Sequence, residues 1–190
     1  NVLKPKSMGG SLERKGQVEV VSSLKRDGRS VFRDLRWGVY VVIEATNDYT
    51  AGCFKQYGMN TDESGRFSAM YKPFHLIGLE LNVSIFSAAL LKKPTGSTQA
   101  FQADVIATAK RKLTSGEVLD GEGGYTVWGK LVSAKKSLAI GGLPIGVASG
   151  LKLKRTISAG SAILWSDIEF DDSQEIFKIR KNMENDVKLG

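Results

Sequence analysis

The first half of the chain alternates apolar and polar residues with the period of β-strands. This alternation predicts four strands, at residues 18–24, 31–35, 37–45 and 67–71. Asp27-Gly28 lies between the first two strands and is typical of a hairpin turn, because both residues tolerate positive φ. The third strand, WGVYVVIEA, is almost continuously apolar, so we expect it to be buried on both faces.

Two helices are predicted around the fourth strand. Asp48 can cap a short helix that continues to Gln56 and stops at Gly58. Pro73 opens a longer helix over residues 74–91. Its apolar stripe has alternating spacings of three and four residues: Leu76, Leu79, Val83, Phe86 and Leu90. A helix this apolar is expected to be mostly buried, and strands followed by such helices predict an α+β unit, with an antiparallel sheet and helices on one face.

Composition shifts predict where this unit begins and ends. Residues 1–16 are rich in Gly, Ser and Lys without periodicity, which is typical of a flexible arm. The folded unit then covers residues 17–98 and ends in the linker KKPTGST at 92–98. Cys53, on the short helix, is expected to be buried as a small apolar residue.

The second half contains a weak internal repeat. AKRKLTSGEVL at 109–119 and LKRTISAGSAIL at 153–164 share Lys-Arg, an aliphatic residue, two small residues and a glycine. The matching glycines are Gly116 and Gly160. Each copy reads as a strand, a turn and a short strand, which predicts a pseudo-symmetric all-β module over 99–170, followed by a C-terminal helix or tail at 171–190.

Charge and composition exclude several classes of function. The net charge is +7, but the excess is spread along the chain and its densest clusters are not interleaved with aromatic residues. We therefore expect a solvated basic surface that attracts anionic substrates, and no nucleic-acid partner. No apolar run approaches the roughly 18 residues of a membrane helix, so no membrane partner is expected.

The N-terminus and the single cysteine bear on compartment and processing. The first ten residues lack the apolar region of a signal peptide, and Cys53 cannot form an internal disulfide. The cytoplasm is the expected location. The absence of an initiator Met indicates a processed chain or a fragment.

Several stretches carry a family resemblance. LKLKRTISAGSAILWSDIEF (151–170) looks like the closing half of a SAF domain, a small β-clip module. SVFRDLRWGVYVVIEA (30–45), YKPFHLIGLEL (71–81), GEGGYTVWGKL (121–131) and GGLPIGVA (141–148) are more specific. Together they resemble the C-terminal part of NAD(P)-dependent oxidoreductases related to homoserine dehydrogenase, including the deoxyxylulose-phosphate-reductoisomerase-like proteins.

The resemblance implies an α+β catalytic and oligomerisation domain followed by a SAF domain, over most of residues 17–185. Such proteins begin with a Rossmann domain, and no Gly-x-Gly-x-x-Gly follows a strand here. The resemblance therefore implies the substrate-side portion of an enzyme that acts on a small polyol- or sugar-derived substrate, with or without a phosphate. Alone, this chain is expected to be inactive and to bind no cofactor. NAD(P) would serve the full-length enzyme.

The candidate catalytic residues are Lys72 and His75. They flank Pro73 at the start of the long helix, with Tyr71 before them and Asn82 two turns along the face that His75 begins. Either Lys72 or His75 could exchange a proton with a substrate oxygen, once burial has brought its pKa toward neutrality. The simpler alternative is that His75, the only histidine, caps or packs against the helix.

Further candidates bind the substrate. Arg36, beside Trp37, could anchor a carboxylate or phosphate, with Tyr71 and Asn82 as neighbours of the catalytic pair. Tyr125 and Trp128 lie in a glycine-rich stretch that could form tight turns, a wall over the active site, or a ligand pocket. Without an Asp-x-Glu-like cluster, no metal site is predicted.

The sequence also bears on the oligomeric state and on an alternative class of function. An apolar sheet face that normally meets the missing Rossmann domain or a second subunit would be uncovered here, so a homo-oligomer is expected. The competing interpretation is a non-enzymatic SAF-type module that binds a small ligand or a partner protein. A Rossmann fingerprint encoded just before Asn1 would favour the enzyme.

Overall fold

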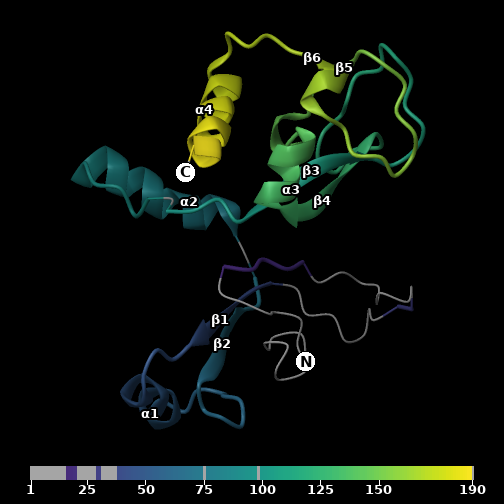
Figure 1. Cartoon of the computed structure of the whole chain (residues 1–190). Helices are drawn as coiled ribbons and strands as arrows, with labels where there is room; N and C mark the ends of the chain where they lie inside the picture. Colours follow the sequence, from purple (N-terminus) through teal and green to yellow (C-terminus); the bar gives the residue numbers. More distant parts are fainter. Residues whose placement is uncertain (1–15, 21–28, 31–37, 75, 98, 190) are drawn as a thin grey trace. The chain divides into compact units, whose positions relative to one another are not determined.

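The computed structural model describes residues 16–20, 29–30, 38–74, 76–97 and 99–189 (Figure 1). The chain divides into two compact units, residues 1–99 and 100–190, and each is described by itself. The predicted strand at 31–35, most of the strand at 18–24, the Asp27-Gly28 turn and nearly all of the predicted arm lie outside the described residues.

The first unit contains a two-stranded antiparallel sheet. Strand β1 (Val39–Glu44) pairs with β2 (Phe67–Lys72), in a register that sets Val39 opposite Lys72 and Glu44 opposite Phe67. Both strands were predicted, but the expected burial of β1 on both faces is wrong, because Val39 and Val41 are exposed. Within the described residues β1 pairs only with β2, and a sheet of two strands has little apolar cover of its own.

Helix α1 (Asp48–Gln56) connects the two strands and confirms the predicted element. Its N-cap is Asn47 rather than Asp48, because the Asn47 Oδ1 accepts a hydrogen bond from the Thr50 N–H at 2.9 Å. Gly58, with φ +68°, follows the end of the helix as expected. The residue that α1 buries is Phe54, whereas Cys53 is only half-buried.

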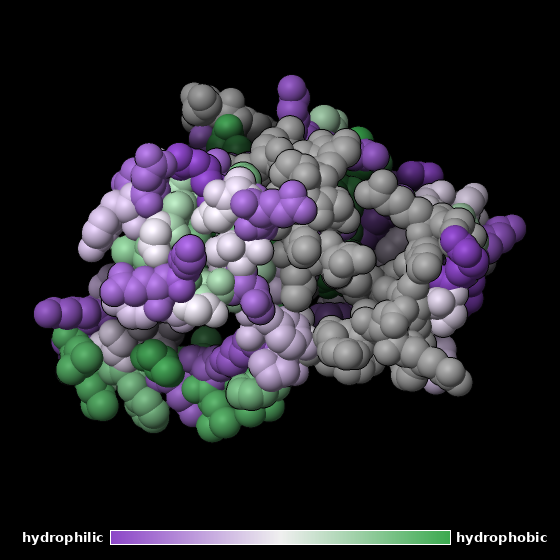
Figure 2. Space-filling model, turned by 90° about the horizontal axis from the view of Figure 1, so that it is seen from below, coloured by the Kyte–Doolittle hydropathy of each residue, from purple (hydrophilic) through white to green (hydrophobic). Residues whose placement is uncertain are grey.

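Helix α2 (Ile77–Phe86) comes after β2 in the chain and continues directly into the π-helix η3 (Ser87–Leu91). They confirm a long helix in this region, but the prediction that it is buried is wrong. None of their residues is buried, and most of their large apolar side chains are exposed. In Figure 2 hydrophobic residues gather at the left end of the surface, the end at which Figure 1 draws α2. The apolar periodicity predicted a helix, but it does not show whether another element packs against that helix.

The second unit is built around a second antiparallel pair, β3 (Ala103–Ala109) and β4 (Val127–Ser133). Helix α3 (Ala134–Ile140) follows β4, a helix that the prediction left out. Ser133 caps it by accepting from the Lys136 N–H, and Gly141, with φ +66°, ends it. The remaining elements are short: η4 (Ile145–Val147), β5 (Lys152–Leu153), η5 (Trp165–Asp167) and β6 (Ile168–Glu169).

Hydrogen bonds between the two repeat copies confirm the predicted pseudo-symmetry. The Gly116 N–H donates to the Leu153 carbonyl at 2.7 Å, and the Gly160 N–H donates to the Ala109 carbonyl at 2.8 Å. These two bonds are equivalent in the alignment of the copies. The apolar core of this unit consists of fully buried side chains, among them Leu113, Leu119, Val127, Leu143, Leu153, Ile157, Ile163 and Ile168.

Helix α4 (Glu175–Leu189) completes the second unit. Its Phe177 packs edge-on against Trp165 and Phe170, with ring centroids 6.1 Å and 5.2 Å away. Arg180 donates to the carboxylates of Asp104 at 2.5 Å and Glu184 at 2.8 Å. Among the described helices, none is long and apolar enough to span a membrane.

Candidate functional site

The corner between β2 and α2 places the predicted catalytic lysine. Lys72 is the last residue of β2, and its ammonium forms an ion pair with the carboxylate of Glu80, in the first turn of α2. The same Nζ atom lies 5.4 Å from the centroid of the Phe74 ring. A cation, a carboxylate and an aromatic face are thereby gathered at one turn of the chain.

Local backbone constraints explain why this corner is stiff. Pro73 fixes its own φ and holds Lys72 in the extended region. From the other strand, Gly38, with φ +142°, approaches so closely that a Cβ there would lie 2.0 Å from the Lys72 carbonyl oxygen. The position therefore requires glycine, and the close approach locks the end of β2 against the start of β1.

Exposure at this corner differs from the expectation. The Lys72 and Glu80 side chains are partly open to solvent, so the expected burial of Lys72 is wrong for the described residues. The ion pair, rather than an apolar pocket, is what fixes the ammonium. An ammonium held in this way can donate a hydrogen bond or a proton to a substrate oxygen that approaches from solvent.

Of the other candidates in the first unit, the structure describes Tyr71 and Asn82. Tyr71 is exposed and lies opposite Tyr40 on β1, and Asn82 is exposed on α2. The Tyr40 hydroxyl donates to a Glu19 carboxylate oxygen at 3.4 Å, and burial together with the nearby Glu19 raises the pKa of Tyr40. His75 and Arg36 lie outside the described residues.

Sequence reasoning missed Glu80 as a member of the site. The structure places the Glu80 carboxylate against the Lys72 ammonium. The available signal was a carboxylate in the first turn of a helix, eight residues after a lysine and beyond a proline corner.

In the second unit, the two predicted aromatic residues lie at and just before the start of β4. Tyr125 and Trp128 are both exposed, and the ring contacts among residues 99–189 join Trp165, Phe170 and Phe177 instead. Trp128 lies on β4 opposite Thr108, and Tyr125 precedes that strand.

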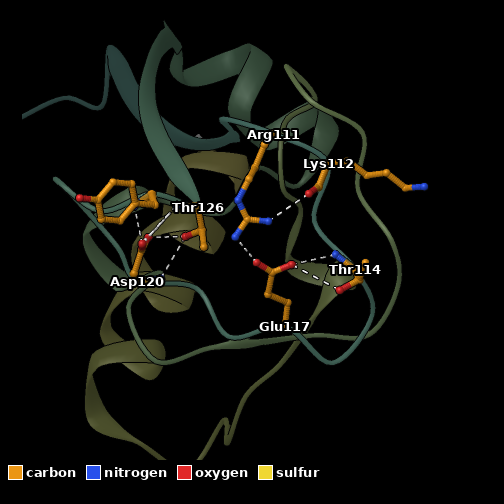
Figure 3. Close-up of polar contacts among 7 residues, drawn as sticks. Arg111, Lys112, Thr114, Glu117, Asp120 and Thr126 are labelled. Carbon is orange, nitrogen blue, oxygen red and sulfur yellow. Dashed lines mark hydrogen bonds and ion pairs between the residues drawn. The ribbon is translucent and has the colours of Figure 1, made fainter.

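The glycine-rich loop is closed by its own carboxylate (Figure 3). Asp120 accepts hydrogen bonds from the Thr126 hydroxyl and from the backbone N–H groups of Tyr125 and Thr126. These bonds, the Thr126 hydroxyl first, lower the pKa of Asp120 to about 2. Gly124 permits the closure, because a Cβ there would collide with the Asp120 carboxylate. This loop has the properties of a tight turn, the first of its three predicted interpretations.

The basic run Lys110-Arg111-Lys112 is largely engaged within the unit. Arg111 donates to the Glu117 carboxylate and, at 3.1 Å, to the Lys112 carbonyl. Arg111 and then the Thr114 N–H lower the pKa of Glu117. Lys110 donates to the Gly124 carbonyl, whereas the Lys112 side chain points away in Figure 3. Two of the three cations thus connect loops.

Metal binding has no visible basis in the part of the chain that the structure describes. No three His, Cys, Asp or Glu side chains there gather closely enough to hold an ion. The acidic groups described above are engaged by Lys72, Arg111, Thr126 and Arg180.

Comparison with known proteins found a similarity in the first unit. Residues 1–81 match a family model described as the catalytic domain of the oxidoreductase DRL. The matched segment covers β1, α1, β2 and the first turn of α2, and it contains both Lys72 and Glu80. No curated protein matches the chain. The N-terminal portion is therefore related to an oxidoreductase catalytic domain, whereas Asn82, Tyr125 and Trp128 lie beyond the match.

Proposed function

We propose that residues 17–98 form the substrate-side catalytic part of an NAD(P)-dependent oxidoreductase, of the homoserine-dehydrogenase-like or reductoisomerase-like kind. The substrate class is a small polyol- or sugar-derived compound, with or without a phosphate. The observation that carries this proposal is the Lys72–Glu80 pair, held at a stiff corner within the segment that matches an oxidoreductase catalytic domain.

The described residues do not fit a dinucleotide. Their three sheets are each two-stranded and antiparallel, and they lack the parallel βαβ crossover whose helix N-terminus receives a pyrophosphate. We therefore propose that the nicotinamide cofactor binds to a domain outside residues 1–190. This chain contributes groups on the substrate side only.

Each substrate-side residue has a distinct proposed role. Lys72 donates a proton to the substrate oxygen during reduction and accepts it during oxidation. Glu80 orients the ammonium, and His75 is the second candidate for proton transfer. Arg36 binds a carboxylate or phosphate of the substrate, because a guanidinium offers a bidentate fork. Tyr71 and Asn82 contact the rest of the substrate.

We also propose that residues 99–170 are a SAF-like β-clip. The paired hydrogen bonds of Gly116 and Gly160 support this proposal, since a β-clip with two related halves would contain them.

The net charge of +7 is favourable for the approach of an anionic substrate.

The test uses the protein joined to its nucleotide-binding domain. Turnover of NAD(P)H is followed by absorbance against a panel of polyols, sugar acids and sugar phosphates. Lys72→Ala and His75→Ala should each lower kcat by about 100-fold or more, the usual effect of losing a general acid. Lys72→Arg should recover substrate binding but not proton transfer.

The control is Lys55→Ala, which removes an exposed lysine in the last turn of α1. It should leave kcat and the melting temperature unchanged. If Lys72→Ala lowers the melting temperature but leaves turnover per folded molecule intact, Lys72 is structural and the catalytic assignment fails.

A further inference from the structure

Helix α2 carries a row of polar side chains that bond to the chain segments on both sides of the helix. Glu80, Ser84 and Ser87 follow one another at intervals of four and three residues, which places them on one side of the helix. Ser87 still has α-helical backbone angles, with φ −59° and ψ −47°. Glu80 is paired with Lys72, at the end of the strand that precedes the helix. The two serines bond to the linker that follows it.

Three hydrogen bonds hold this linker against the helix. The Ser87 hydroxyl donates to the Lys93 carbonyl at 2.8 Å, and the Lys93 N–H donates to the Ser87 carbonyl at 3.2 Å. The hydroxyl oxygens of Ser84 and Thr95 lie 2.8 Å apart and share a third bond. From residue 93 to residue 95 the linker thus runs back along the helix, from Ser87 toward Ser84. We call residues 92–95 the anchor segment.

The backbone reverses direction at Lys92. Its φ of +56° is the only positive φ outside glycine among the described residues, and its N–H also donates to the Ser87 carbonyl. Left-handed backbone is costly for a residue with a Cβ, so it persists where the surrounding contacts fix it. Pro94 fixes its own φ and favours extended backbone at Lys93. Less chain entropy is therefore lost when the anchor segment bonds to the helix.

After Thr95 the linker runs into open space. A Cβ at Gly96 would meet no atom within 4 Å. Ser97 is exposed, and its hydroxyl accepts a hydrogen bond from the Gln99 side chain at 2.7 Å, within the linker itself. The first unit ends at residue 99. Only a short stretch of chain therefore separates the anchor segment from the second unit.

We propose that the anchor segment is a reversible attachment that sets the length of the tether between the two units. While it is bonded, the free tether is residues 96–99, and once it is released the tether is residues 92–99. At about 3.3 Å per extended residue, release lengthens the reach from about 13 Å to about 26 Å. The attachment is reversible because exposed hydrogen bonds exchange with water. A shorter tether raises the effective concentration of one unit at the other.

The attachment and the candidate site use the same side of α2. Ser84 follows Glu80 by one helical turn, about 6 Å along the axis. The tether is therefore anchored within one turn of the ion pair between Lys72 and Glu80. The proposal does not depend on a catalytic role for Lys72, so its test measures no activity. Failure of the proposed function and failure of the tether are thus distinguishable.

The first test is limited proteolysis of the full chain and of the double variant Ser84→Ala/Ser87→Ala. Both substitutions remove a bond to the linker, and alanine has the highest helix propensity, so unfolding of α2 cannot explain a gain in cleavage. Trypsin cuts after Lys92 once the anchor segment is released, whereas Pro94 protects the bond after Lys93. The initial rate of cleavage after Lys92 should rise about fivefold or more.

The second test measures the distance between the two units by pulsed electron paramagnetic resonance. Spin labels are attached at Lys55→Cys on α1 and Lys135→Cys on α3, both exposed positions, in a chain that also carries Cys53→Ser. In the Ser84→Ala/Ser87→Ala background the distribution of label distances should broaden and extend to longer values, because the tether has gained four residues.

Ser97→Ala is the matched control. It removes a hydroxyl from the same linker, beyond the anchor segment. It should change neither the cleavage rate after Lys92 nor the distance distribution. Circular dichroism verifies that all variants retain the same helix content. Unchanged cleavage in the double variant, an unchanged distance distribution, or an equal effect of Ser97→Ala would each overturn the proposal.

Discussion

Leu113 and Ile157 exchange two backbone hydrogen bonds, each 2.9 Å long, and they occupy the same position in the two repeat copies. A pair of residues that bond to each other reciprocally lies on the pseudo-two-fold axis that relates the copies. Equivalent bonds follow on both sides: Ala109 donates to Ser161, and Leu153 donates to Glu117, at 2.9 Å in each case. The second unit is therefore organised by the repeat rather than by a large sheet.

The two turn glycines should be equally sensitive to substitution. Gly116 and Gly160 have φ values of +84° and +76°, and a Cβ would meet no close atom at either position. The cost of Gly→Ala is then conformational alone, about 1–2 kcal/mol for each variant. Urea unfolding followed by near-ultraviolet circular dichroism measures this loss.

The control for this pair is Gly146→Ala. Gly146 lies in η4, has no positive φ and is also surrounded by open space. Its substitution should be neutral or slightly stabilising, because alanine loses less chain entropy on folding. Equal unfolding midpoints for all three variants would show that the turns of the repeat do not require glycine.

Arg180 should be a strong determinant of stability. Its side chain is mostly buried and is shared between two buried carboxylates, those of Asp104 and Glu184. Arg180→Met removes the cation and leaves both carboxylates without it, which should cost about 3–5 kcal/mol. The loss appears as a lower free energy of unfolding in urea.

An exposed ion pair provides the comparison. Arg66 pairs with Asp48, whose side chain is almost fully exposed. Arg66→Met should change the free energy of unfolding by no more than about 1 kcal/mol, because solvent screens this pair. Similar losses for both variants would mean that burial does not govern the effect.

Local pattern predicted the parts of the fold that short-range spacing controls. The strands β1 and β2 and helix α1 each follow from residues within a dozen positions of one another, and each copy of the repeat is itself no longer than that. The α1 cap was displaced by one residue, because Asn47 and Asp48 have equivalent capping chemistry and only the backbone path selects between them.

Contacts between residues that are far apart in the sequence could not be predicted from local pattern. Asp104 and Arg180 are 76 residues apart, and nothing in their surroundings singles out either as the partner of the other. The exposure of α2 was mispredicted for a related reason, since burial depends on what packs against a helix and not on the helix alone. In the candidate site, Lys72 and Tyr71 were predicted and Glu80 was missed, because its contact crosses the Pro73 corner.

The pKa of Asp120 should depend on one hydroxyl group. The Thr126 hydroxyl is the main cause that lowers it from 3.8 to about 2. Thr126→Val should therefore raise the Asp120 pKa toward 3.8, as followed by carboxyl chemical shifts in an NMR titration. Because the folded-state pKa is depressed, the stabilisation is complete above about pH 4 and is lost as pH falls from 3.8 to 2. If the variant titrates at the same pH as the unmodified chain, the backbone N–H groups alone fix the carboxylate.

The last prediction concerns the glycine that locks the candidate site. A Cβ at Gly38 would lie 2.0 Å from the Lys72 carbonyl oxygen, a backbone atom that cannot easily yield. Gly38→Ala should therefore force β1 and β2 apart at the end where Val39 pairs with Lys72. Amide hydrogen exchange along both strands should accelerate at least tenfold. Gly52→Ala, in open space within α1, is the matched control and should slow exchange in that helix, since alanine favours helix by about 1 kcal/mol. Unchanged exchange in β1 and β2 after Gly38→Ala would mean that the corner is compliant, and a compliant corner could not hold Lys72 as the proposed mechanism requires.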